Sequence, residues 1–492
     1  MTRFSLLALL VCAPPVLAQP SIPPIEPADF LLPDESKMTP FKDRVPVLFV
    51  TSNQPEWKAL KTFWNEGGTQ DEVDPATGLK VTRKVVKLKV PLGLTQPPPV
   101  PAENQITAEK WALGKQLYYD KILSSNGEVA CASCHAPEKG FADGKRVSTG
   151  INGALGPINS PTVSNAAYNR FQFWDGRGSS LEDQAQGPVG NAKEMFGGKD
   201  DPWQEAVQRL RANAEYVKAF NRVFGHAPTR DAAAKAVATY ERTVLLGNSL
   251  EDKAYALMRK RVIEEESGKF VLKAEDYANT LKAEFAAKGT ALKDIGLDAE
   301  KDAGKADEFG KRLLNGRELF FNKARCTSCH TGDTFTDHTF HNIGVGAKDG
   351  ELPLDEFGRF VRLPTGHKDT ALVGAFKTPG VRGLLWTAPY MHSGDEKTLE
   401  EVVEFYDRGG NVNPWLDEKM RDTTAEAAYI KARAEGKLVD PAVKTYGPGK
   451  KPIIPLKLNL TAPEKADLVL FLKALNGDPL DPLVSDPAKF PK

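Results

Sequence analysis

The sequence predicts a mainly α-helical protein of two similar helical domains in tandem, preceded by a proline-rich N-terminal extension. Three pairs of matching stretches carry this prediction: Cys131–His135 with Cys326–His330, Gly114–Asp120 with Gly316–Asn322, and Phe141–Asp143 with Phe335–Asp337. Matching stretches in the same order are typical of an internal duplication. The alternative is one domain with a chance second motif, and the similarity of the flanking residues argues against it.

Both central motifs have the spacing Cys-x-x-Cys-His, which is typical of c-type haem attachment. The residues concerned are Cys131, Cys134, Cys326 and Cys329 for bonding to the porphyrin, with His135 and His330 as proximal iron ligands. A zinc or redox site is the alternative for a Cys-x-x-Cys pair. Zinc would use four sulfurs and leave no reason for a histidine after each pair. We therefore expect two cytochrome-c-like domains, each with one covalently bound c-type haem.

Residues 1–18 are predicted to be a secretory signal peptide. Arg3 precedes an apolar run, Phe4–Val11, and small residues end the segment at Ala18. The run is too short for a membrane span. Cys12 lies inside the segment, and lipidation there is the weaker interpretation because Val11 is bulky for the preceding position. We expect a periplasmic protein with no membrane span.

The composition is that of a soluble protein with more than one domain. The chain has 492 residues, 41% of them hydrophobic, and a mean hydropathy of −0.39. Its 65 basic and 65 acidic side chains balance. No basic stripe is visible, so nucleic acid is not an expected partner.

The expected order is a signal peptide (1–18), the proline-rich extension (19–105), a first haem domain (106–247), a charged helical insertion (248–311), and a second haem domain with its tail (312–492). Within the extension, Pro55–Glu66 is predicted to form a short helix and Lys80–Val90 a strand. The insertion is expected to be exposed. A helix is expected from Thr461 to Leu475, opened by a capping residue.

The stretch between the haem motifs contains the candidate catalytic residues. Ser179 and Glu182 have the spacing of a capping box that opens a helix, and Gln184, Pro188 and Glu194 follow. Splitting peroxide at a haem needs an open iron face, a base that moves a proton, and a polar group that holds the peroxide. Glu194 suits the acid/base role and Gln184 the hydrogen-bonding role. The alternative is that both are ordinary solvated side chains.

Several motifs together resemble the bacterial di-haem cytochrome c peroxidases, which include the MauG-type enzymes. They are the two Cys-x-x-Cys-His motifs, Phe173–Arg177, Glu194–Met195, Phe376–Pro379 and Ala388–Gly394. The resemblance covers roughly residues 105–245 and 306–410. It does not cover the extension, and the insertion has an untypical length.

The resemblance implies roles for individual residues. The family's distal glutamate falls on Glu194, its glutamine on Gln184, and the tryptophan between the haems on Trp174. A structural calcium between the domains would be bound by the side chain of Asn159 and by carbonyls at Thr387 and Pro389. Oxygen ligands suit calcium.

The loop Thr149–Gly153 departs from the commonest family pattern. Many members carry a histidine there that caps the first haem until the enzyme is reduced, and Ile151 occupies that position here. Isoleucine cannot bind iron. We therefore expect the first haem to be open without reductive activation.

The sixth ligand of the second haem is the other departure. The helix predicted from Thr398 to Asp407 carries Tyr406 where the usual methionine would lie, as in MauG-type enzymes. A tyrosinate oxygen favours ferric and higher states, whereas methionine raises the potential. The alternatives are a core tyrosine or ligation by Met391 or Met420.

Three functions are compatible with these observations. The first is a periplasmic peroxidase that reduces hydrogen peroxide at the open haem, with electrons from a small cytochrome or cupredoxin relayed through the second haem. The second is a MauG-like oxidase that uses peroxide-derived high-valent haems to oxidise a partner protein or organic substrate. The third is a non-enzymatic di-haem electron carrier, which Ile151 disfavours. A homodimer is compatible with each.

Overall fold

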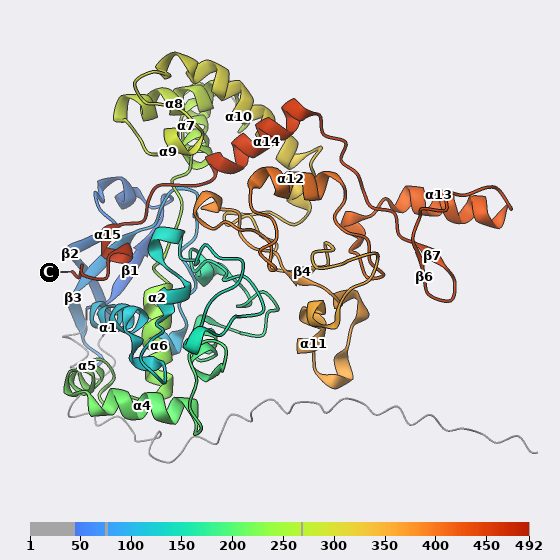
Figure 1. The fold of residues 1–492 in the computed structure, drawn as a ribbon. Helices are drawn as coiled ribbons and strands as arrows, with labels where there is room; N and C mark the ends of the chain where they lie inside the picture. Colours follow the sequence, from blue (N-terminus) through green and yellow to red (C-terminus); the bar gives the residue numbers. More distant parts are fainter. Residues whose placement is uncertain (1–44, 74–76, 267–268, 492) are drawn as a thin grey trace, which may run out of the picture.

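The computed structural model describes residues 45–73, 77–266 and 269–491. Residues 1–44, with the expected signal peptide, Cys12 and the first prolines of the extension, lie outside that part. The described chain is mainly helical, with long connecting loops and small sheets (Figure 1). No helix within it is long and apolar enough to cross a membrane.

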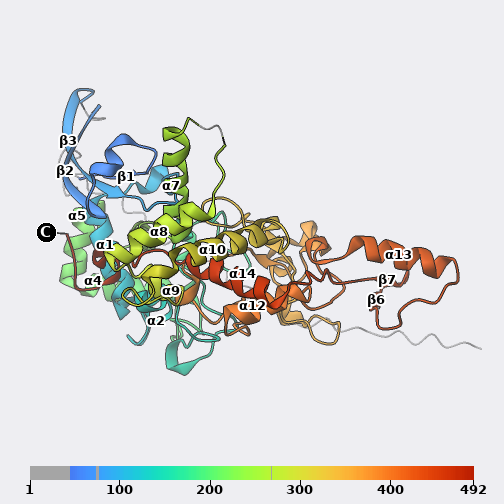
Figure 2. The same ribbon diagram turned by 90° about the horizontal axis from the view of Figure 1, so that it is seen from above.

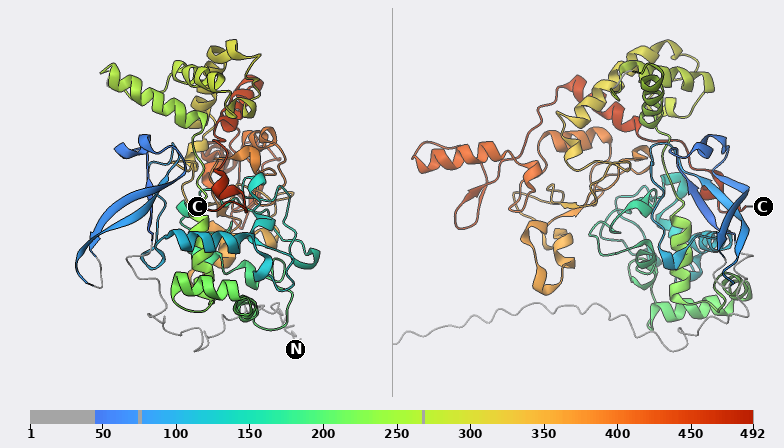
Figure 3. Two further views of the ribbon diagram at one scale, coloured as in Figure 1. Left: turned by 90° about the vertical axis from the view of Figure 1, so that its left-hand side faces the viewer. Right: turned by 180° about the vertical axis from the view of Figure 1, so that it is seen from behind.

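The described part of the extension forms a three-stranded sheet on the side of the first half. Its order is β1-β3-β2, with β1 (Val47–Val50) parallel and β2 (Trp64–Val73) antiparallel to the central β3 (Lys80–Lys89) (Figure 3). Trp64 and Leu88 are buried in the core of the first half. The extension is therefore part of that core.

One expectation within the extension is confirmed and one is wrong. The strand expected at Lys80–Val90 is β3. The helix expected at Pro55–Glu66 is only a short 3-10 helix, Pro55–Ala59, because β2 begins at Trp64. Most of β2 is polar and exposed, so its sequence lacks the apolar alternation that would have predicted a strand.

The first half is helical around one core. Its helices are α1 (Ala108–Tyr119), α2 (Cys131–Cys134), α3 (Leu181–Gln184), α4 (Pro202–Ala212), α5 (Ala214–Phe224) and α6 (Arg230–Glu241). α1 crosses α6 at Gly114, where a Cβ atom would lie 1.8 Å from the carbonyl oxygen of Ala236. Only glycine permits so close a crossing.

The charged insertion is helical, but it is not merely exposed. Its helices are α7 (Leu250–Glu264), α8 (Ala274–Ala287), α9 (Ala291–Asp294) and the start of α10 (Ala306–Phe321). Buried side chains such as Met258, Tyr277 and Leu281 form a core that α10 and α14 share. Glu264, Glu265 and Glu266 are exposed, whereas Glu251, Asp252 and Asp276 are buried.

The second half begins within α10 and repeats the glycine crossing. Its other elements are β4 (Phe340–His341), α11 (Arg359–Arg362), β5 (Phe376–Lys377), α12 (Leu399–Asp407), α13 (Thr423–Ala434), β6 (Thr445–Tyr446), β7 (Lys451–Pro452), α14 (Ala462–Ala474) and α15 (Pro482–Ser485). A Cβ atom on Gly316 of α10 would lie 2.0 Å from the carbonyl oxygen of Asp467 in α14. Gly114 and Gly316 thus serve the same purpose in the two halves.

The C-terminal tail returns to the first half, where α15 lies near α1 and the sheet (Figure 1). Lys115 of α1 is fully buried and donates to the carbonyl oxygens of Leu483, Asp486 and Lys489, at 2.5–2.7 Å. Tyr240 donates to the carbonyl of Val484 at 2.6 Å. The last residues therefore complete the core of the first half.

Candidate haem sites

The first Cys-x-x-Cys-His motif forms α2 and ends at a half-buried histidine. The Nδ1 atom of His135 lies 3.3 Å from the carbonyl oxygen of Phe141 and 3.1 Å from the hydroxyl of Ser160. Burial lowers the pKa of His135, which favours the neutral imidazole that binds metals. With Nδ1 engaged, Nε2 is the nitrogen left to bind iron.

The second motif uses the same arrangement. The Nδ1 atom of His330 lies 2.9 Å from the carbonyl oxygen of Phe335, and burial lowers the pKa of this histidine as well. Phe141 and Phe335 both have left-handed backbones, with φ of 60° and 54°. Each half therefore turns a carbonyl toward the histidine and leaves Nε2 for a metal.

The four cysteines fit thioether attachment better than zinc binding. All four are free. Burial raises the pKa of Cys134 to about 11 and of Cys326 to about 12, so these two are protonated thiols. Among the described residues, no cluster of potential metal ligands contains cysteines of both motifs. The cluster that does form joins Cys329 to Asp337 and His341. His341 is held there by hydrogen bonds to Asp337 and Asp417 at 2.8 and 2.7 Å.

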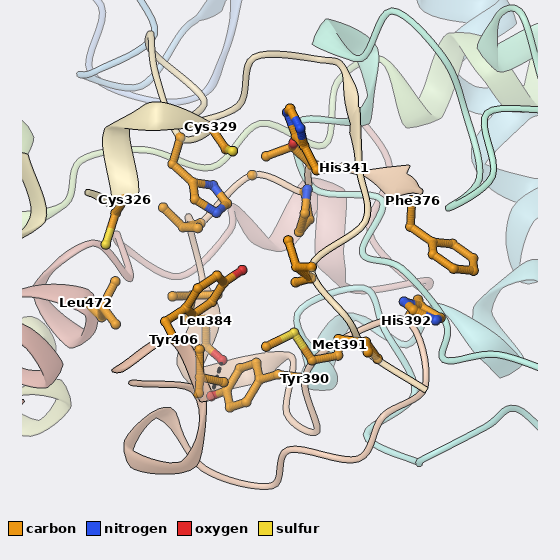
Figure 4. Close-up of a pocket in the computed structure, with 18 of the residues that line it drawn as sticks. Cys326, Cys329, His341, Phe376, Leu384, Tyr390, Met391, His392, Tyr406 and Leu472 are labelled. Carbon is orange, nitrogen blue, oxygen red and sulfur yellow. Dashed lines mark hydrogen bonds between the residues drawn. The ribbon is translucent and has the colours of Figure 1, made fainter. Parts of the chain in front are cut away.

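A cavity of about 260 Å³ lies beside the second motif (Figure 4). Cys326, Cys329 and His330 line it, and α12 lines it with Leu399, Val402, Val403 and Tyr406. Further apolar residues in its wall include Leu384, Leu458, Leu468 and Leu472. An apolar cavity with a histidine and two thiols in its wall fits a covalently bound haem.

Tyr406 and the two competing methionines all line this cavity. The ring of Tyr406 lies among Cys326, Leu384 and Tyr390, with its hydroxyl directed into the cavity (Figure 4). Burial raises the pKa of Tyr406 far above its usual range, so the phenol keeps its proton unless a metal ion binds the oxygen in place of that proton. Met391 and Met420 also reach the cavity wall. Cavity lining alone therefore does not separate the three candidates.

Lys377 is a buried cation in the wall of the same cavity. It is 8% exposed, and its ammonium group has no hydrogen bond or ion pair within the described residues. Burial alone lowers its pKa to about 8. A cation in an apolar wall favours an anionic partner, and a haem bound in this cavity would offer its carboxylates. The sequence motifs predicted no role for Lys377, although it lies within Phe376–Pro379.

Residues 159–188 and 377–406 follow the same backbone course at a constant offset. Each segment has a 3-10 helix, Ala166–Tyr168 or Leu384–Trp386, and later a residue with positive φ, Phe173 at 64° or Met391 at 66°. Each then forms a capped helix, α3 or α12. At this offset Pro188 occupies in the first half the position of Tyr406 in the second.

The capping box expected at Ser179 and Glu182 is displaced by one residue. Ser180 is the N-cap of α3, and its hydroxyl accepts from the backbone N–H of Asp183. Asp183 in turn accepts from Ser179. Glu182 is instead paired with the buried Arg242 at 2.9 Å. The corresponding box in α12, Thr398 with Glu401, is formed as expected.

Glu194 lies on a turn held by Asn191. The amide of Asn191 donates to Glu194 Oε1 at 2.5 Å, and its carbonyl accepts from the backbone of residues 194–196. Burial raises the pKa of Glu194, opposed by the positive charge of Arg177 and by the Asn191 hydrogen bond. Asn191 had no role in the sequence interpretation, and its spacing of three from Glu194 was the available signal.

Ile151 and Gln184 take different positions relative to Glu194. Ile151 is buried, and its N–H donates to the carbonyl oxygen of Glu194 at 2.9 Å. Gln184 ends α3 and is half-buried. Within the described residues, no hydrogen bond joins Gln184 to Glu194. The two side chains are thus not preassembled as a pair.

Aromatic side chains connect the two halves. Trp174 lines the cavity beside the second motif, and its Nε1 donates to the carbonyl of Asn159 at 2.9 Å. Its ring centroid lies 6.3 Å from that of His392, which stacks on Phe376 at 3.5 Å (Figure 4). His392 is fixed by Glu356 at 2.7 Å. His392 lies in the Ala388–Gly394 motif, but no role was predicted for it.

The three expected calcium ligands all belong to the lining of the cavity beside the second motif. Asn159, Thr387 and Pro389 all line it. The amide of Asn159 donates to the carbonyl of Lys145 at 2.8 Å, which leaves its side-chain oxygen free to act as a ligand.

A mainly helical chain with two such histidine–thiol sites is typical of a di-haem c-type protein. A family model described as di-haem cytochrome c peroxidase matches residues 108–260. The cytochrome-c peroxidase IdrP1 of Denitromonas iodatirespirans is 31% identical, over 82% of this chain and 90% of the relative. The methylamine utilization protein MauG of Methylorubrum extorquens is 33% identical, over 66% of this chain and 75% of the relative.

A solved structure is similar as well. It is that of a MauG-like protein associated with microbial copper homeostasis, with 28% identity, a TM-score of 0.54, and coverage of 80% of this chain and 95% of that chain. The chain belongs to the di-haem cytochrome c peroxidase family. It is a peroxidase-type oxidoreductase with two c-type haems, and the carrier alternative is thereby set aside.

Proposed function

We propose that this chain is a periplasmic peroxidase that reduces hydrogen peroxide to water at the His135 site, with electrons delivered from the second site by way of Trp174. The observation that supports it most is Pro188 at the position that Tyr406 holds in the other half. A proline side chain cannot bind iron, and neither can Ile151. When bound at His135, the haem supplies an iron that takes peroxide as a ligand and accepts its oxidising equivalents.

Glu194 is the proposed acid/base. A carboxylate at its Oε atoms can take the proton from one peroxide oxygen and return it to the other, which leaves as water. Its raised pKa brings it closer to neutral pH, where both transfers are efficient. Gln184 is assigned the hydrogen bond that holds peroxide, and Pro188 leaves room for it.

The test is Glu194→Gln in the full-length haem-loaded protein. We expect the rate constant for the reaction with peroxide to fall about 100-fold or more, measured by stopped-flow absorbance. The wild-type rate should decrease as the pH falls through the raised pKa of Glu194, because the base must be deprotonated, and the variant should lose this dependence. Glu215→Gln, on an exposed position of α5, is the matched control. A wild-type rate in Glu194→Gln contradicts the assignment.

Trp174 and Asn159 support two further parts of the proposal. Trp174 belongs to the first half of the chain, yet it lines the cavity beside the second motif. This position between the two sites suits a path for electrons. The free side-chain oxygen of Asn159, with the carbonyls of Thr387 and Pro389, suits a calcium ion that joins the halves. The electron donor is proposed to be a small cytochrome or cupredoxin.

A MauG-like oxidase is the second candidate, and Tyr406 favours it. A phenolate ligand at the second site stabilises oxidised iron, so the oxidising equivalents from peroxide would be used to withdraw electrons from a partner protein or organic substrate. We expect Tyr406→Phe to change the optical and EPR spectra of the second haem. Tyr390→Phe, in the same cavity, should leave them unchanged. Unchanged spectra in Tyr406→Phe would transfer the ligand role to Met391 or Met420.

A further inference from the structure

A projecting arm, residues 421–457, leaves the second half and returns to it. It contains α13 and the β6–β7 hairpin and extends away from the body on the side opposite the N-terminal sheet (Figures 1 and 2). Leu438 on it is fully exposed and Ile430 is 44% exposed. We call this segment the basic arm. These two side chains give the projection a small amount of exposed apolar surface.

The base of the basic arm is fixed beside the second haem site. The N–H of Asp422 donates to the carbonyl of Ile454, and that of Leu456 to the carbonyl of Met420, both at 2.8 Å. Glu426 accepts from the N–H of Ile454 at 3.0 Å and pairs with Arg421. Met420 and Leu456 line the cavity of the second site. The base of the arm therefore lies next to that site.

The basic arm is strongly positive in a chain that is neutral as a whole. Its eight basic residues are Arg421, Lys431, Arg433, Lys437, Lys444, Lys450, Lys451 and Lys457, and its four acidic residues are Asp422, Glu426, Glu435 and Asp440. The arm thus has a net charge of +4. Because the whole chain has 65 charges of each sign, the rest has −4.

We propose that the basic arm docks an acidic redox protein that exchanges electrons with the second site. Clustered cations speed encounter with an acidic surface, an effect that salt weakens. Ile430 and Leu438 offer apolar contact once the partner has arrived. Each encounter oxidises the partner's metal by one electron. Two encounters supply the two electrons that, with two protons, convert one hydrogen peroxide into two waters.

This inference rests on the proposed function, and the experiment separates the two. Full-length haem-loaded protein is mixed with peroxide and either a reduced acidic cupredoxin or a reduced basic cytochrome c, and the second-order rate of probe oxidation is measured against ionic strength. The variant Lys431→Glu/Lys437→Glu/Lys444→Glu reverses three exposed charges of the arm. The control Lys260→Glu/Lys293→Glu/Lys301→Glu makes the same change of charge on the insertion.

We expect the acidic probe to react faster than the basic one at low ionic strength, and the arm variant to slow it at least tenfold. The difference should shrink at high salt, and the control should stay within twofold of wild type. Equal rates for both probes, or equal effects of both variants, overturn the docking proposal. An effect of the arm variant on self-association alone, measured by sedimentation, also overturns it and assigns the arm to a dimer. Peroxide consumption with a small-molecule reductant tests the proposed function independently of the arm.

Discussion

Lys377 is a buried lysine whose charge favours an anionic group in the cavity that it lines. Its side chain is buried in the wall of the cavity beside the second motif, and no acceptor for its ammonium group lies within the described residues. Its backbone N–H donates to the carbonyl oxygen of Trp174 at 2.7 Å. Asn159, the expected calcium ligand, holds the equivalent position in the first half. One position in the repeat thus carries an oxygen donor in one half and a cation in the other.

The cation at Lys377 should affect the second haem. A nearby positive charge disfavours the ferric form, so we expect Lys377→Met to lower the midpoint potential of that haem, measured by spectroelectrochemical titration. The exposed Lys348→Met is the control and should leave the potential unchanged. An unaltered potential in Lys377→Met would mean that its ammonium group lies away from the haem.

At the level of elements, the two glycine crossings determine how closely the main helices pack. Gly114→Ala would place a methyl group within 1.8 Å of the Ala236 carbonyl, so α1 and α6 would have to separate. We expect a loss of about 3 kcal/mol in the free energy of unfolding, measured by urea denaturation. Gly304→Ala, with no atom within 4 Å of the new methyl group, should change it little. Equal stability of both variants would refute the close crossing.

Local signals explain which elements could be predicted. The caps at Thr398 and Thr461 lie within the helices' own sequences, so α12 and α14 were predictable. Strand β2 was not, because its polar residues are held by pairing with β3 rather than by an apolar pattern. The haem ligands follow from a contiguous motif. Asn191 had only its spacing of three from Glu194 as a signal, and the burial of Lys377 arises only in the folded chain.

At the level of the whole molecule, a buried ion pair ties the extension, the insertion and the second half together. Arg382 binds Asp252 of α7 through two contacts, at 2.6 and 2.9 Å, and reaches the carbonyl of Gly93 at 3.4 Å. Both side chains of the pair are nearly fully buried.

Breaking this pair from one side should be costly. Asp252→Ala leaves Arg382 buried without its partner, and we expect a loss of about 3–5 kcal/mol in the free energy of unfolding. Adding Arg382→Met should restore part of it, as a double-mutant cycle would measure. The exposed pair of Lys282 with Asp307 provides the comparison, since Asp307→Ala should cost less than about 1 kcal/mol. Similar losses in both single variants would rule out a special role for the buried pair.

The contact between Lys115 and residues 483–489 makes the stability of the first half depend on a segment that is distant in sequence. A product that ends before residue 483 would leave the Lys115 ammonium group in an apolar interior without its three carbonyl acceptors. The damage would fall on α1, which leads into the first haem motif. Loss of the segment that contacts Lys115 would therefore destabilise a helix that lies more than 360 residues earlier in the chain.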